Sequence, residues 1–195
     1  MEGRLPRIGA GGVQAGIVEL ETQATRIAEF RPGMISGLLQ TSEYAREFLH
    51  LACGPLSYGQ DEDEIDRMVA KRMQRQVLYQ PAKRVKVVML EGAPRERVVS
   101  VSTLVGRLDR LLAVIELPTL ELGITAFEAA VPVFALSGFR LYDALVIVES
   151  IVGEQQLAEA DDVARYEKCL ELLRDAASLG TEAAAVIGRS RESLR

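Results

Sequence analysis

The spacing of apolar positions divides the chain into helical and extended stretches. Apolar residues recurring every three or four positions predict helices over residues 18–30, 41–51, 60–79, 102–115, 161–179 and 181–187. Short apolar or alternating runs predict strands over residues 85–90, 119–125, 133–137 and 145–149. Two of these strands flank a helix with short links, which is typical of a right-handed crossover between parallel strands.

This order of elements predicts an α+β fold in which N-terminal and C-terminal helices cover a small mixed β-sheet of about four strands. The connection over residues 138–143 is short enough for a hairpin. Residues 1–17 are rich in glycine without a sustained period, so we expect a flexible arm or linker there. We expect residues 18–190 to form a single domain and residues 191–195 to fray.

Helix-breaking and helix-capping residues sharpen these boundaries. Pro32 and Gly33 should end the first helix, and Thr41 or Ser42 can cap the second. Gly180 is a suitable residue just after a helix C-terminus, so it should end the helix over residues 161–179.

Composition excludes several classes of protein. The 195 residues carry a formal net charge of −5, which argues against broad binding to phosphate backbones. One histidine excludes a His-rich metal site, and Cys53 and Cys169 lie in no metal-ligand or redox spacing. We therefore predict no metal and no cofactor. Neither a leader peptide nor an apolar run of membrane-spanning length is visible, so the expected location is cytoplasmic.

Three groups of polar residues edge the predicted helices and strands. They are Gln40, Glu43, Tyr44 and Arg46; Arg72, Arg75 and Gln76; and the strand-end carboxylates Glu91 and Glu149. If they converge, they could bind a polar ligand group in a partly dry pocket. A buried ion-pair scaffold would leave the same pattern. The candidate ligand-binding residues are Gln40, Tyr44, Arg72, Gln76, Glu91 and Glu149.

The run Gly-Leu-Leu-Gln-Thr-Ser-Glu-Tyr-Ala-Arg at residues 37–46 carries a family resemblance. Further matching positions are Glu19, Glu21, Ala24, Phe30-Arg31-Pro32-Gly33, Arg72-x-x-Arg75-Gln76 with Leu78, Val87-x-x-Leu90-Glu91, Leu108-x-x-Leu111-Leu112 and Val146-x-Val148-Glu149. Over about residues 18–190 the chain resembles a domain of actinobacterial, antitoxin-type transcriptional regulators. In that family the domain follows a lambda-repressor-like helix-turn-helix module and is often paired with a small partner protein.

The chain departs from that family in two ways. Most members have a proline where this chain has Ser36, and we expect no helix-turn-helix module within residues 1–195. Either these residues are the C-terminal domain of a longer protein, or the protein has kept only the sensor-like part. The resemblance thus implies a regulatory domain that binds a small hydrophobic molecule or a small partner protein. We expect no direct contact with nucleic acid and no membrane association, and a homodimer stays open.

An enzyme is the alternative reading. A sensor domain freed of its DNA-binding module could act on a hydrophobic metabolite as a cyclase or isomerase, because such chemistry needs only a shaped pocket and an acid or base. The candidate catalytic residues would be Glu91, Glu149, Tyr44 and Arg72.

Overall fold

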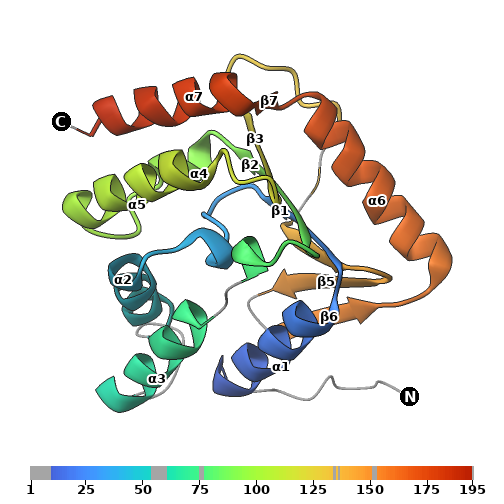
Figure 1. The fold of residues 1–195 in the computed structure, drawn as a ribbon, viewed down its shortest axis with the longest axis horizontal. Helices are drawn as coiled ribbons and strands as arrows, with labels where there is room; N and C mark the ends of the chain where they lie inside the picture. The colour runs from blue at the N-terminus through green and yellow to red at the C-terminus, as the bar shows by residue number, and fades with distance from the viewer. Residues whose placement is uncertain are drawn as a thin grey trace.

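The computed structural model describes residues 10–53, 61–74, 77–133, 135, 137–150 and 153–194. Within these residues, one mixed sheet of seven strands has the order β6-β5-β4-β1-β2-β3-β7 (Figure 1). The strands are β1 (Arg26–Arg31), β2 (Arg84–Leu90), β3 (Leu120–Thr125), β4 (Phe139–Tyr142), β5 (Leu145–Ser150), β6 (Gly153–Leu157) and β7 (Ser178–Leu179). The α+β class is confirmed, but the expected number of about four strands was wrong.

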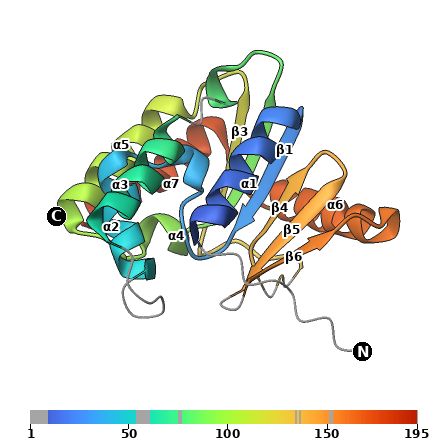
Figure 2. The ribbon, with the colours of Figure 1, turned by 90° about the horizontal axis from the view of Figure 1, so that it is seen from below.

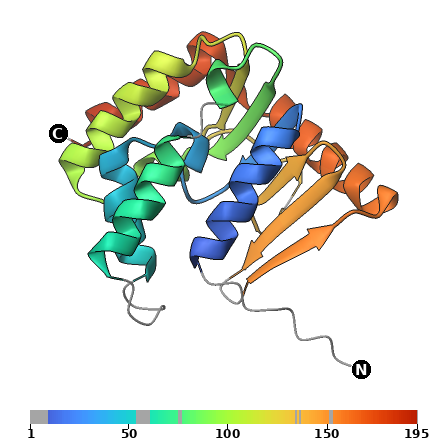
Figure 3. The ribbon, with the colours of Figure 1, turned by 60° about the horizontal axis from the view of Figure 1, so that its bottom comes forward.

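Helices cover both faces of this sheet. They are α1 (Ala10–Gln23), α2 (Ser42–Cys53), α3 (Glu62–Met73), α4 (Gly92–Arg95), α5 (Val101–Val114), α6 (Ala160–Asp175) and α7 (Gly180–Glu192). Two 3₁₀ helices, Gly37–Leu39 and Val77–Tyr79, lie between them. Figures 2 and 3 show α6 on the opposite side of the sheet from α1, α2 and α3.

Alternation along the strands divides the core between the two faces. In β2, Val85, Val87 and Met89 pack in the cluster that contains α5 and α7 side chains, whereas Val88 packs in the cluster that contains α6 side chains. β1 pairs with β2, and β2 with β3, in parallel, so the predicted parallel crossover is confirmed. β4 and β5 then run antiparallel beyond β1.

The first predicted helix was wrong in its second half. Residues 18–30 were expected to be helical, but α1 ends at Gln23 and β1 follows as a central strand. The sequence of β1 does not look like a buried strand, because the charged residues Glu29 and Arg31 are buried beside Ile27 and Phe30. Arg31 pairs with Glu29 and with Glu149, which lies 118 positions away, so no local pattern records why these charges are buried.

The hairpin between β4 and β5 also differs from the prediction. A strand was expected over residues 133–137, but the residues described in that range are not in a strand, and β4 occupies the expected connection. The chain turns at Asp143, whose φ of 48° lies in the left-handed region that Asp tolerates better than most residues. β6 was not predicted.

The helix ends differ as well. α3 stops at Met73 rather than near residue 79, and α6 stops at Asp175 before the short strand β7. Gly180 has the left-handed backbone expected of it, with φ of 53°, but it begins α7 instead of following a helix. α7 continues to Glu192 and Leu194 is buried, so the expected fraying was wrong, as was an arm reaching residue 17, since α1 begins at Ala10.

Candidate functional site

Gln40 of the first predicted group and Arg72 of the second meet on the helical side of the molecule. The Arg72 Nη1 donates to Gln40 Oε1 at 2.9 Å, and Gln40 Nε2 donates to the Ile35 carbonyl oxygen at 3.2 Å. Gln40 thus holds the loop before α2 against α3. Arg75 and Gln76 lie outside the described residues.

Tyr44 stands beside them in a stack of rings and guanidinium groups. Its ring is parallel to that of Phe48, with centroids 6.3 Å apart. Arg107 lies over Tyr44 at 5.3 Å and Arg72 over Phe48 at 5.8 Å. Burial raises the pKa of Tyr44, so the phenol stays protonated at neutral pH.

Arg107 is an unusual member of this stack, because its side chain is completely buried. Nη2 donates to the Ser36 carbonyl oxygen at 3.3 Å, but Nε and Nη1 have no hydrogen-bond partner among the described residues. Burial, aided by nearby Arg110, lowers the pKa of Arg107 to about 9. It still carries a charge at neutral pH, and that charge lacks an acidic partner in the described structure.

Glu149 belongs to a separate, strongly paired network at the carboxyl ends of β1 and β5. It accepts from Arg31 at 2.8 Å and from Arg140 at 2.7 Å. Arg31 also pairs with Glu29 at 3.0 Å, and Arg140 with Glu154 at 2.7 Å. We call these five residues the buried ion-pair network.

Pairing keeps the carboxylates of Glu29 and Glu149 ionised. Burial alone would raise the pKa of Glu29, but the charge and hydrogen bond of Arg31, with the charge of Arg140, bring it below its ordinary value. The pKa of Glu149 is lowered in the same way, with Arg140 and Arg31 outweighing burial. Such carboxylates are poor proton donors or acceptors near neutral pH.

Glu91 lies at the same edge of the sheet, one residue after β2, with different partners. Its carboxylate accepts from Arg95 at 2.5 Å and from the Phe127 backbone N–H at 3.0 Å, and its side chain is 2% exposed. Arg95 in turn lies over the Phe127 ring at 5.3 Å. The structure therefore brings Gln40, Tyr44 and Arg72 together, and gives Glu91 and Glu149 separate arginine partners.

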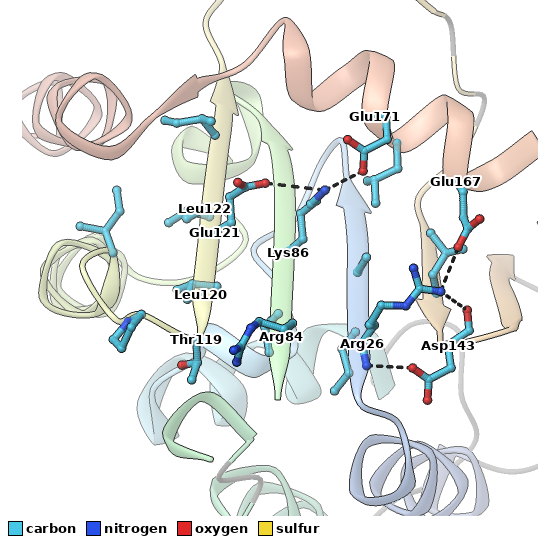
Figure 4. Close-up of a pocket in the computed structure, with 18 of the residues that line it drawn as sticks. Arg26, Arg84, Lys86, Thr119, Leu120, Glu121, Leu122, Asp143, Glu167 and Glu171 are labelled. Atoms are coloured by element: carbon cyan, nitrogen blue, oxygen red, sulfur yellow. Dashed lines mark hydrogen bonds and ion pairs between the residues drawn. The ribbon is translucent and has the colours of Figure 1, made fainter. Parts of the chain in front are cut away.

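A groove of about 770 Å³ lies at the opposite edge, where β1, β2 and β3 begin, beside α6 (Figure 4). It contains none of the predicted site residues. The lining residues are Arg26, Ile27, Ala28, Arg84, Val85, Lys86, Ile115, Pro118, Thr119, Leu120, Glu121, Leu122, Leu141, Asp143, Glu167, Leu170, Glu171, Leu179 and Gly180. This volume and this mixture of apolar and charged groups are typical of small-molecule sites.

Ion pairs between α6 and successive strands form one side of the groove. Arg26 of β1 pairs with Glu167 at 3.1 Å, and Lys86 of β2 pairs with Glu171 at 2.6 Å. Glu121 of β3 accepts two hydrogen bonds from Arg174, each at 3.1 Å. These hydrogen bonds lower the pKa of Glu121.

Asp143 and Arg84 complete the polar lining. The Asp143 carboxylate accepts from the backbone N–H groups of Thr25 and Arg26, at 3.0 and 2.8 Å, and so fixes the start of β1. Arg84 Nη1 donates to the carbonyl oxygens of Pro81 and Lys83, both at 2.9 Å.

Sequence reasoning missed the groove because its charged residues look like ordinary solvent-exposed positions. One signal was available: Arg26, Arg84 and Glu121 each stand at or near the start of a strand, and Glu167 and Glu171 lie one turn apart. Only the sheet order brings these positions together.

No helix in the described parts of the chain is long and apolar enough to cross a membrane. Among the same residues, no three metal-type ligands gather at one point.

Fold and groove together define an α+β domain with a cleft of small-molecule size beside α6. Residues 14–189 match the family model described as a domain of unknown function, DUF5753, so the chain belongs to that family. No curated protein matches the chain.

Proposed function

We propose that this chain is a regulatory domain that binds a small molecule in the groove beside α6 and does not bind DNA by itself. The observation that carries the proposal is the groove, because its size and its mixture of apolar and charged lining suit a small ligand. The resemblance to regulator domains supports the same reading, with a small partner protein as the other class of ligand that it implies.

The contacts of the predicted catalytic residues favour binding over catalysis. Glu149 and Glu91 are each held by arginine, and Arg72 is hydrogen-bonded to Gln40. A general acid or base needs a pKa near the working pH, and the pKa of Glu149 is moved away from it. The enzyme alternative therefore gains no support from the groups that were expected to carry it.

Native mass spectrometry of the isolated protein tests this proposal. We expect a bound small molecule on the native chain and its loss from an Ala28→Phe variant, since Ala28 lines the groove on central strand β1 opposite Lys86. Arg165→Gln is the matched control, because Arg165 lies on α6 but does not line the groove. An identical bare mass for all three proteins would contradict the proposal.

The proposal also states that this chain does not bind DNA by itself. A sequence-specific shift of duplex DNA by this chain alone, in a gel assay at physiological salt, would contradict it.

A further inference from the structure

We infer that the ligand of this groove carries an anionic group of the carboxylate or sulfonate class, bound by Arg84, on an apolar body that lies along the groove. The inference rests on the proposed function and adds the chemistry of the ligand to it.

Arg84 is singled out by the charges around it. The two other lining cations have acidic partners, since Arg26 pairs with Glu167, and Lys86 pairs with Glu171. Among the described residues Arg84 has only carbonyl partners. It is therefore the groove cation whose charge remains available to a ligand.

The geometry of the Arg84 guanidinium also suits an anion. Its two carbonyl contacts both use Nη1, which fixes the plane of the group. Nε–H and Nη2–H make no hydrogen bond within the described structure, and they share the other edge of the guanidinium. Two parallel N–H groups on one edge are the donor pattern that binds a carboxylate with two hydrogen bonds.

Each acidic group of the lining already has partners. Glu167 pairs with Arg26, Glu171 with Lys86 and Glu121 with Arg174, whereas the Asp143 carboxylate accepts two backbone N–H groups. Figure 4 shows Arg84 between Thr119 and Arg26, with Glu167 and Glu171 across the groove on α6.

Apolar side chains line the same groove as Arg84. Thr119 immediately precedes β3, and its carbonyl oxygen accepts the Val85 N–H at 2.8 Å, so the start of β3 lies directly beside the start of β2. Ile115 and Pro118, just before β3, line the same groove with Leu120. A ligand with both an anionic head and an apolar body can therefore contact Arg84 and this lining together.

Two fluorescent probes with the same rings separate the anion from the apolar body. Anilinonaphthalene sulfonate carries a negative charge, and N-phenyl-naphthylamine lacks it. We expect Arg84→Gln to weaken sulfonate binding about tenfold, because a charge-assisted pair of hydrogen bonds is lost, and to leave binding of the neutral probe unchanged. Arg165→Gln should bind both probes like the native chain.

The two claims fail in different ways. The role of Arg84 would be overturned if Arg84→Gln and the native chain bound the sulfonate with equal affinity. If Ala28→Phe still lost binding of both probes, the groove would remain the binding site. Probe binding that is unchanged by Ala28→Phe would count against the groove itself. Circular dichroism and thermal unfolding of each variant show whether it is folded.

Discussion

The two edges of one sheet use charge in opposite ways. At the carboxyl ends of β1 and β5, Arg31 and Arg140 are almost fully buried and both bind Glu149. At the amino ends of β1, β2 and β3, the charges are more exposed, and Arg84 has no acidic partner in the described structure. The first edge is held together by ion pairs, whereas the second leaves N–H donors of Arg84 without a partner in the described structure.

This difference shows why polar residues at strand ends are ambiguous in a sequence. Glu91 follows an apolar strand and Glu149 lies near the end of one, a position shared by many active-site groups, yet both carboxylates are held by arginine. The pairing of a charged group, more than its place in the chain, separates scaffold from site.

The largest expected effect comes from breaking the buried ion-pair network. Arg31→Met leaves Glu29 buried without its hydrogen-bonded partner, so the free energy of unfolding should fall by about 3–5 kcal/mol. Urea unfolding measures this change. Arg84→Met, at the other edge, is the control and should change stability by less than ~0.5 kcal/mol. Similar losses for both variants would remove the contrast between the two edges.

Acid should lower the stability that the buried ion-pair network contributes. The lowered pKa values of Glu29 and Glu149 mean that the folded chain binds fewer protons than the unfolded chain near their ordinary value of 4.5. Their contribution is complete above that value and is lost as pH falls through the lower folded pKa.

Urea unfolding between about pH 7 and about pH 3 measures this dependence. Glu149→Gln should reduce the loss of stability below pH 4.5. A profile for Glu149→Gln that matches the native one would show that Glu149 does not carry the effect.

Arg107 tests how burial of a charge without an acidic partner affects stability. Its charge is buried with two N–H-bearing nitrogens unpartnered among the described residues, so Arg107→Met should raise the free energy of unfolding by about 1 kcal/mol. Differential scanning calorimetry of the two proteins tests the sign. A large loss of stability would show that burial of the guanidinium is itself favourable here.

The smallest expected effect is at the rim of the groove. Lys86 and Glu171 are partly exposed, with side chains 28% and 52% accessible, so Glu171→Gln should cost less than about 1 kcal/mol. The loss should shrink further at high salt, which screens exposed pairs. A loss as large as that of Arg31→Met, in the same unfolding assay, would contradict the distinction drawn between the edges.

Local patterns predicted the parts of this fold whose contacts are local. The apolar run of β2, the helix of α5 and the cap of α2 are present, with the Tyr44 N–H donating to Thr41 Oγ1 at 3.2 Å. The strand β1 was mistaken for a helix because its buried charges depend on Arg140 and Glu149.

The candidate site shows the same limit. The contact between Gln40 and Arg72 joins two elements that the sequence had marked as polar, so part of the grouping could be anticipated. The groove requires β1, β2, β3 and α6 to be placed side by side, and that arrangement depends on sheet order. No residue of the groove was therefore proposed from sequence.

The most direct test of the central claim is a map of backbone amide shifts by nuclear magnetic resonance during titration with N-phenyl-naphthylamine. We expect the largest shifts at Arg84, Glu121 and Glu171, which line the groove. Shifts concentrated at Glu91 and Glu149, with the groove unaffected, would contradict the account and place binding at the opposite edge of the sheet.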